Sequence, residues 1–333
     1  MRVAVGMSGG VDSTVAAVLL RDLGHEVVGV TMTLGRADEE ASLSEARAAA
    51  GRLGIPLAEY DFSEAWRTWV LDDLRREFLS GRTPNPCVRC NETVKFSLLP
   101  ERAFDDGCDL FATGHYARLA EGRLFRAVDR TKDQSYFLYR VRPEILARTL
   151  LPLGGLTKAE VRAIAAANGL PVASKGDSQD FCGGDPLAIV AEPDREGAVV
   201  DVKGRAIGSH RGYWHYTVGQ RKGLGIGGGT PYYVVRIDAE RNEVVVGFRE
   251  TALVREFALE GVVGLPVGRL GDVSVKVRSA GEPRGPVMVE TFPDGTARVT
   301  CPNGLAGVAP GQSAVFYAND AILGGGIIRH PKA

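Results

Sequence analysis

The residues Gly6–Thr14, GMSGGVDST, place glycines, hydroxyl side chains and one aspartate directly behind a short apolar run. Glycines let a backbone turn sharply and approach a ligand closely. A helix that begins at Val11 presents unpaired amide groups with partial positive charge, and such an end binds anions. We therefore expect a phosphate-binding loop, with Ser8 and Ser13 as hydroxyl donors and Asp12 as a holder of Mg²⁺ or its water shell.

A plain glycine turn with a helix cap is the alternative reading of this loop. It explains one serine and one glycine, but it leaves Asp12 and the second serine without a purpose. The loop lacks the lysine of a Walker A motif and the spacing of the dinucleotide fingerprint. Its Ser-Gly-Gly-x-Asp-Ser pattern resembles the PP-loop of the ATP pyrophosphatases. That resemblance implies cleavage of ATP to AMP and pyrophosphate while a substrate oxygen is adenylated.

An adenylated oxygen is a leaving group, and two cysteines are candidates for the nucleophile that displaces it. Cys90 lies in TPNPCVRCNETVKF and Cys182 lies in SKGDSQDFCGG. Polar and turn-forming residues surround both, which is typical of an accessible thiol rather than a core one. Arg89 and Lys95 favour the thiolate of Cys90, whereas two aspartates near Cys182 oppose ionisation there.

The other cysteines carry weaker signals. Cys87 and Cys90 have the spacing of half a zinc site, but no second pair follows and the histidines show no ligand spacing, so we expect no metal held by protein ligands alone. An iron–sulfur cluster on Cys87, Cys90 and Cys182 stays open as an alternative. We expect Cys108 and Cys301 to be buried or inert.

The period of the sequence predicts an α/β fold at the start of the chain. Strand-like and helix-like segments alternate up to about residue 115, as expected for a doubly wound parallel sheet. Capping-box patterns at Ser42–Glu45 and Thr157–Glu160 predict two helix starts. Residues 141–195 look mainly helical and extend this first domain, which we bound at residues 1–195.

Beyond residue 196 the chain changes to short strands separated by glycine turns. This pattern predicts a small β-rich central domain over residues 196–252 and a β-barrel domain over residues 253–333.

Composition bounds the class of protein. A chain of 333 residues favours two or three domains, and five cysteines form no dense disulfide framework. No apolar run has bilayer length and no signal-like segment is present, so we expect a cytoplasmic protein without a membrane partner. The net charge of −1 argues against a uniformly basic coat but leaves RNA binding through local patches open.

A series of blocks along nearly the whole chain carries a family resemblance: GMSGGVDS, GRTPNPCVRCN, VKF, ATGHYAR, KDQSYFL, DSQDFC, YTVGQRKGLGI, and PGQSAVFY with LGGGII. In this order they resemble the bacterial tRNA-specific 2-thiouridylases, the MnmA family. The resemblance implies an enzyme that uses ATP to install sulfur at C2 of the wobble uridine in tRNAs for lysine, glutamate and glutamine. It also implies a PP-loop domain of the HUP type, a small central domain and a C-terminal β-barrel.

The resemblance also assigns roles to residues. Cys90 matches the nucleophile, and Cys182 matches the cysteine that receives a persulfide from a cysteine desulfurase or sulfur carrier. The two are implied to end each turnover as a disulfide that a reductant resets. ATP is assigned to Gly6, Met7, Ser8, Gly9, Gly10, Val11, Asp12, Ser13, Met32 and Gly114. The tRNA is assigned to Asn85, Pro86, Cys87, His115, Lys132, Asp133, Gln134, Arg278, Ser279 and Gln312. Cys87 stands where some relatives carry aspartate, which keeps the cluster alternative open.

Arg221 and Lys222 add a prediction from the residues themselves. They lie between glycines and near aromatic residues in YTVGQRKGLGI, as an RNA-contacting loop requires. We expect the chain to act as a monomer. Two rival functions are a PP-loop ligase that adenylates a small substrate, which needs neither Cys90 nor Cys182, and a nucleotide-binding module without activity.

Overall fold

The computed structural model describes residues 1–37, 39–170, 184–227 and 229–329. Contacts between Cα atoms divide the chain into two compact units. Among the described residues, unit 1 comprises 1–70, 87–170 and 320–322, and unit 2 comprises the rest.

Unit 1 is built on a five-stranded sheet of order β3-β2-β1-β4-β7, in which every pair is parallel. Its strands are β1 (Arg2–Gly6), β2 (Glu26–Thr33), β3 (Leu57–Asp61), β4 (Leu110–Ala112) and β7 (Thr149–Leu150). The order has β1 in the middle and grows outward on both sides. The predicted doubly wound parallel sheet is therefore confirmed.

Helices cover both faces of this sheet because successive side chains of β1 point to opposite sides. Val3 and Val5 join one buried cluster with residues of α1, α2 and α8, whereas Ala4 joins another with Phe96 and Leu99. The helices of the first face are α1 (Val11–Asp22), α2 (Glu39–Leu53) and α8 (Lys158–Ala167). Elsewhere in the unit lie α3 (Ser63–Trp66), α5 (Pro86–Cys90), a π-helical segment Asn91–Leu98, α6 (Leu99–Asp105), a 3₁₀ turn Ser135–Leu138 and α7 (Pro143–Leu146).

The two predicted capping boxes have different outcomes. Thr157 caps α8 with its side chain and Glu160 closes the box, as predicted. The prediction for Ser42–Glu45 is wrong, since α2 already begins at Glu39. The Glu39 carboxylate accepts hydrogen bonds from the backbone N–H groups of Leu34 (2.7 Å) and Arg36 (3.2 Å), and this local closure starts the helix earlier.

Two strand features of unit 1 differ from the sequence prediction. A hairpin of β5 (Ala117–Ala120) and β6 (Arg123–Arg126) turns through Glu121 and Gly122, both with positive φ, so a glutamate occupies a position where asparagine or aspartate is the usual signal. In the segment expected to be mainly helical, β7 adds two residues to the sheet through Phe111 and Thr149. So short a strand forms because the neighbouring strand β4 supplies its pairing partners, which lie far from it in the sequence.

Unit 2 holds the predicted short strands. A four-stranded sheet of order β10-β11-β8-β9 is formed by β8 (Gly197–Asp201), β9 (Ala206–His210), β10 (Tyr233–Asp238) and β11 (Glu243–Gly247). Helical pieces of the unit are α4 (Asp72–Leu79), which continues a π-helical turn Arg67–Leu71, α9 (Pro186–Val190) and the 3₁₀ turns Tyr213–His215 and Arg249–Ala252.

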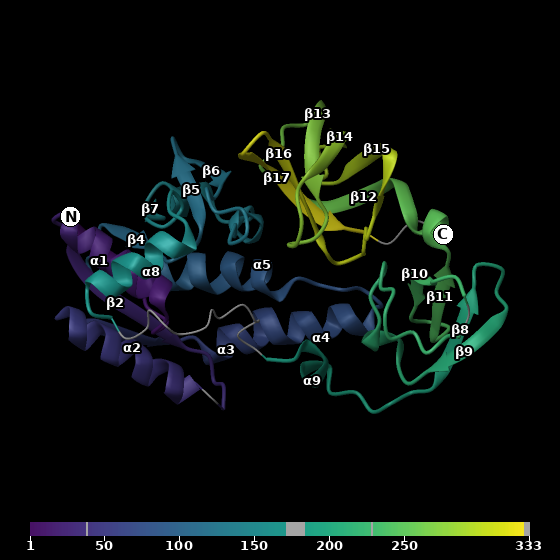
Figure 1. The fold of residues 1–333 in the computed structure, drawn as a ribbon, viewed down its shortest axis with the longest axis horizontal. Coiled ribbons are helices and arrows are strands. Elements are labelled where there is room, and N and C mark those ends of the chain that lie inside the picture. The colour runs from purple at the N-terminus through teal and green to yellow at the C-terminus, as the bar shows by residue number, and fades with distance from the viewer. Residues whose placement is uncertain (38, 171–183, 228, 330–333) are drawn as a thin grey trace. The chain divides into compact units, whose positions relative to one another are not determined.

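The last six strands close into a barrel, because β12 pairs with both β15 and β17. They are β12 (Leu253–Val263), β13 (Gly268–Lys276), β14 (Arg284–Thr291), β15 (Ala297–Ala306), β16 (Ser313–Ala318) and β17 (Ala321–Ile328). Alternating residues such as Val287, Val289 and Phe316 fill its core. The predicted C-terminal barrel is confirmed (Figure 1), whereas the domain boundaries at 195 and 252 remain predictions.

A close backbone approach behind β5 gives a test of the unit 1 fold. A Cβ atom added to Gly154 would lie 2.5 Å from the carbonyl carbon of Ala117, whereas one added to Gly155 would meet no atom within 4 Å. We expect Gly154→Ala to lower the free energy of unfolding by about 3 kcal/mol, the upper end for overpacking. Gly155→Ala is the matched control. Equal denaturant midpoints for the two variants would contradict the packing described.

Candidate adenylation site

The predicted phosphate loop joins β1 to α1. Met7 extends the strand ladder by donating its N–H to the Val30 carbonyl at 2.7 Å. Gly9 has φ of +74°, and a Cβ there would lie 2.8 Å from the carbonyl carbon of Glu45 on α2. Glycine is therefore required where the loop turns against this neighbouring helix. Gly10 is the N-cap of α1 and has extended backbone angles.

Hydroxyl groups fix the shape of the loop. The Ser13 Oγ accepts the Ser8 N–H at 3.2 Å, lies 3.3 Å from the Ser8 Oγ and donates to the Gly10 carbonyl at 3.2 Å. Thr14 donates its Oγ1–H to the same carbonyl at 2.8 Å. Ser8 and Ser13, predicted as phosphate donors, thus lie together at the start of α1.

Asp12 is held by two residues from distant parts of the chain. The Lys158 Nζ donates to both carboxylate oxygens of Asp12, at 2.7 and 2.9 Å, and the Tyr116 hydroxyl donates to Oδ1 at 2.8 Å. The Lys158 side chain is 11% exposed and that of Asp12 is 33% exposed. The sequence reading passed over both partners. Lys158 was visible only as part of a capping box and Tyr116 as part of ATGHYAR.

Gly114 lies against the same loop. A Cβ at Gly114 would come within 2.7 Å of the Ser13 nitrogen and of the Asp12 carbonyl carbon. The predicted ATP residues Gly6–Ser13 and Gly114 are therefore brought together. Met32 lies half-buried on β2, packed against the second core cluster.

Cys90 ends α5 and is buried, with 2% of its surface exposed, while Cys87, one turn earlier, is half-buried. The expectation of an accessible Cys90 is wrong. The polar stretch around it forms a helix that runs directly into the segment Asn91–Leu98, and this helix packs Cys90 inward. Cys182, the predicted partner, lies outside the described residues.

The cations expected beside Cys90 also have other contacts. The Arg89 guanidinium donates to the Trp69 carbonyl and pairs with Glu92, both at 3.2 Å. Cys108 and Cys301 are buried as predicted. Burial raises the pKa of the Cys301 thiol to about 11, and it also raises the pKa of Cys108. Both therefore stay protonated thiols at neutral pH.

His115 follows β4 and contacts Phe96 of the segment Asn91–Leu98. Its ring packs against Phe96 with centroids 5.3 Å apart, and its Nδ1 lies 2.8 Å from the Thr113 Oγ1. Burial, with the nearby Lys95 charge, lowers the pKa of His115 to about 3. The ring is therefore neutral at physiological pH.

Of the loop residues assigned to tRNA, Asp133 and Gln134 have structural contacts. The Asp133 side chain is 2% exposed and pairs with Arg126 at 3.3 Å. The Gln134 side-chain Oε1 accepts the backbone N–H of Tyr116 at 2.9 Å, and the backbone N–H of Gln134 donates to the Tyr116 carbonyl at 2.8 Å. Lys132 is half-buried on the same loop.

Two of the unit 2 residues assigned to tRNA, Gln312 and Arg278, also make structural hydrogen bonds. Gln312 donates its amide to the carbonyls of Thr83 (2.8 Å) and Pro84 (3.3 Å), immediately before Asn85 and Pro86. Arg278, with the half-buried Ser279 beside it, donates to the Val218 carbonyl at 2.6 Å and so braces the chain ahead of Arg221.

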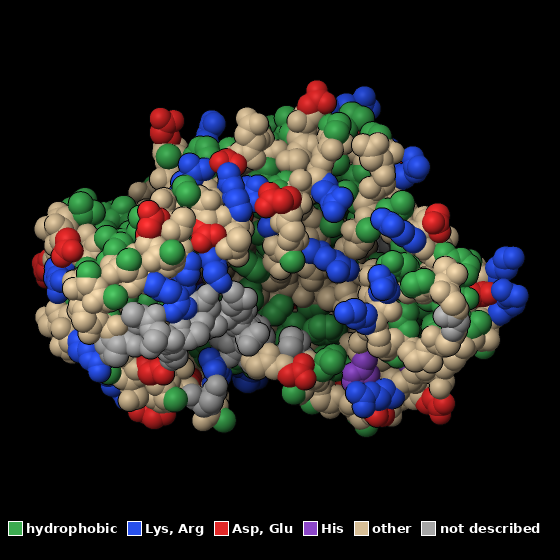
Figure 2. Space-filling view, in the orientation of Figure 1, with side chains coloured by type: hydrophobic (Ala, Val, Ile, Leu, Met, Phe, Trp, Pro, Cys, Tyr) green, Lys and Arg blue, Asp and Glu red, His purple; other side chains and the backbone are tan. Residues whose placement is uncertain are grey.

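The side chains of Arg221 and Lys222 are exposed, and Arg221 lines a shallow cavity of about 360 Å³ with Leu224, Tyr232 and their neighbours. On the face drawn in Figure 2, Lys and Arg side chains lie among acidic ones and form no continuous basic coat, which agrees with the net charge of −1.

Known proteins resemble this chain over its whole length. Family models for a tRNA methyl transferase HUP domain, a tRNA methyl transferase PRC-barrel domain and an aminomethyltransferase beta-barrel domain match residues 1–183, 190–248 and 262–328. The tRNA-specific 2-thiouridylases MnmA of Geotalea uraniireducens and Chloroflexus aurantiacus are each 44% identical, over 99% of this chain and 95% and 99% of theirs. The chain belongs to the MnmA family of tRNA-specific 2-thiouridylases.

This membership confirms the family suggested by the sequence blocks. A predicted tRNA methyltransferase subunit from Methanocaldococcus jannaschii matches half of the chain at a TM-score of 0.36 and 21% identity, too weakly to bear on the site. Within the described residues, no group of three metal-ligating side chains is found, and no helix is long and apolar enough to cross a membrane.

The lowered pKa of His115 predicts a pH dependence of stability. The unfolded chain takes up a proton at the ordinary histidine pKa of 6.5 and the folded chain only near 3, so stability falls as the pH drops through this window. Between about pH 7 and pH 5 we expect His115→Asn to lose about 1–2 kcal/mol less than the unsubstituted protein. Denaturant unfolding at both pH values measures this, with His25→Asn as control. Equal losses in all three proteins would contradict the lowered pKa of His115.

Proposed function

We propose that this 2-thiouridylase replaces the C2 oxygen of a wobble uridine in tRNAs for lysine, glutamate and glutamine by sulfur, with Cys90 and Cys182 as the reacting thiols. The observation that carries the proposal is the phosphate loop at Asp12 within a chain that matches 2-thiouridylases from end to end. A ligase that adenylates a small molecule has no use for Cys90 and Cys182.

The residues of the loop fit a nucleoside triphosphate. The start of α1 offers backbone N–H groups, Ser8 and Ser13 offer hydroxyls, and Lys158 supplies the cation that the loop sequence lacks. ATP supplies the adenylyl group that turns uracil O2 into a leaving group. Asp12 keeps one third of its side chain exposed, which leaves room for Mg²⁺ or its water shell beside Lys158.

The two thiols complete the exchange of the C2 oxygen for sulfur. The terminal sulfur of a Cys182 persulfide attacks C2, and the activated oxygen leaves with AMP. The Cys90 thiolate then attacks the Cys182 sulfur, the sulfur–sulfur bond to the base breaks, and both electrons of that bond stay on the new thiocarbonyl sulfur. Cys90 and Cys182 end as a disulfide, which an external dithiol reduces. The alternative route frees hydrosulfide when Cys90 attacks the persulfide first, and it ends in the same disulfide.

The proposal includes a cytoplasmic monomer that receives its persulfide from a cysteine desulfurase or a sulfur carrier. A reducing compartment suits an enzyme whose disulfide must be reset in every cycle. The iron–sulfur variant, with Cys87, Cys90 and Cys182 as ligands, is the second candidate, because Cys87 and Cys90 lie one turn apart on α5. Iron analysis of the anaerobically purified protein separates the two.

Substitution of the cysteines tests the relay. We expect Cys90→Ser and Cys182→Ser each to abolish 2-thiouridine formation, measured by mass spectrometry of the anticodon nucleoside, while tRNA-dependent pyrophosphate release persists because the adenylation residues are intact. Cys108→Ala, at a buried thiol outside the site, is the control and keeps thiolation. Full thiolation by either serine variant would refute the relay.

Removal of the Lys158 charge tests the phosphate site. We expect Lys158→Met to lower kcat/KM for ATP in tRNA-dependent pyrophosphate release by at least about 10-fold, which corresponds to about 1.4 kcal/mol. Asp12→Asn and the double variant complete a cycle, and their effects should be non-additive since the two groups share hydrogen bonds. Lys203→Met, at an exposed turn, is the control. Unchanged ATP dependence in Lys158→Met would exclude its contact with phosphate.

A further inference from the structure

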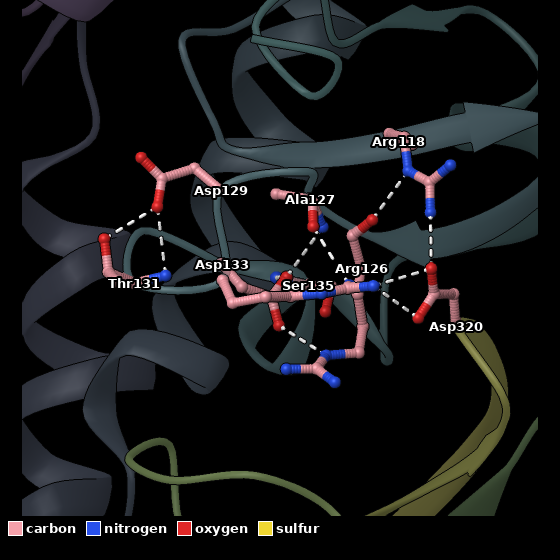
Figure 3. Close-up of polar contacts among 9 residues, drawn as sticks. Arg118, Arg126, Ala127, Asp129, Thr131, Asp133, Ser135 and Asp320 are labelled. Atoms are coloured by element: carbon pink, nitrogen blue, oxygen red, sulfur yellow. Dashed lines mark hydrogen bonds and ion pairs between the residues drawn. The ribbon is translucent and has the colours of Figure 1, made fainter. Parts of the chain in front are cut away.

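The segment Ala127–Gln134, here called the 127–134 loop, is cross-linked by its own side chains. The Asp129 Oδ1 accepts the Thr131 N–H at 3.0 Å and the Thr131 hydroxyl at 2.7 Å. The Asp133 Oδ1 accepts the N–H groups of Ala127 (3.1 Å) and Ser135 (3.2 Å). Figure 3 shows both carboxylates closing their own turns. The hydrogen bond from Thr131 lowers the pKa of Asp129, so this closure persists at neutral pH.

Arginines anchor the loop on the body of unit 1. Arg130 donates to both Asp320 oxygens, at 2.6 and 2.7 Å, and to the Ala127 carbonyl at 3.0 Å. Arg118 donates to Asp320 at 2.9 Å (Figure 3). Two guanidinium groups share one carboxylate, so the anchor keeps a positive charge, and each is 38% exposed. A loop braced in this way shifts as one body, and its anchor attracts RNA phosphates.

The loop contacts both of the residues that hold Asp12. The Asp129 Oδ2 accepts the backbone N–H of Lys158 at 3.0 Å. Gln134 exchanges two hydrogen bonds with the backbone of Tyr116, at 2.8 and 2.9 Å. Through Lys158 and Tyr116 a displacement of the loop reaches the Asp12 carboxylate, whose hydrogen bonds depend on the placement of these two donors.

We propose that Tyr116 and Gln134 are positioning residues that link RNA bound at the 127–134 loop to Asp12, so that bound RNA tightens the binding of ATP. The inference rests on the proposed function, because it requires the loop to face the tRNA and Asp12 to serve the ATP site. Linkage makes the effect reciprocal, so ATP tightens tRNA binding by the factor by which tRNA tightens ATP binding.

Tyr116→Phe tests the link because it removes one hydroxyl and keeps the ring. The affinity for a non-hydrolysable ATP analogue is measured with and without saturating tRNA, and tRNA affinity is measured without the analogue. We expect the tightening of analogue binding by tRNA to fall at least about 5-fold, the lower end of typical coupling, with tRNA affinity unchanged. Tyr60→Phe is the matched control. Its hydroxyl also donates to an aspartate, Asp106, at 2.7 Å, and the Asp106 carbonyl accepts from Arg2 at the opposite end of β1.

Gln134 provides a second, independent pair of variants. Gln134→Glu keeps an oxygen that accepts the Tyr116 N–H and should keep the tightening of analogue binding by tRNA, whereas Gln134→Leu removes the acceptor and should lose it. Tightening that stays at the unsubstituted level in both Tyr116→Phe and Gln134→Leu overturns the inference alone. If the unsubstituted enzyme releases no pyrophosphate in response to tRNA, the proposed function fails and the inference fails with it.

Discussion

The geometry of the rest of the site depends on one partly buried carboxylate at the first turn of α1. Asp12 lies where the helix N-terminus favours negative charge, and Lys158 and Tyr116 hold its oxygens in place. An unpaired charge at this depth is costly, so the lysine at the start of α8 stabilises both the fold and the geometry of the loop. Gly9 and Gly114 are needed for a steric reason, because a side chain at either position collides with the backbone around the loop.

Cys90 sits in a different environment from Asp12. Its thiol is buried at the end of α5, whereas the proposed exchange requires its sulfur to meet that of Cys182. Pro86 is the first residue of α5, a position that proline favours, and Asn91 begins the next helical segment. The turn-forming residues of this stretch therefore lie at the ends of α5 and do not expose the thiol.

The sequence predicted the parallel sheet, the barrel and the loop residues because each has a local pattern: alternating elements, short strands between glycines, and Gly9, Gly10 and Ser13 together. It did not predict Lys158 at Asp12, since 146 residues separate them and only the packing of α8 beside α1 joins them. The two-residue strand β7 likewise depends on its neighbour β4. The polar sequence around Cys90 predicted an accessible thiol. This prediction was wrong because burial depends on what packs against a helix, which the local sequence does not show.

The central claim is that uracil O2 departs with AMP. It is tested most directly with tRNA carrying ¹⁸O at C2 of the wobble uridine, a single turnover with ATP and persulfide, and mass spectrometry of the products. The account predicts one ¹⁸O atom in the phosphate of AMP for each 2-thiouridine formed. Label released into water or inorganic phosphate, with unlabelled AMP, would contradict it.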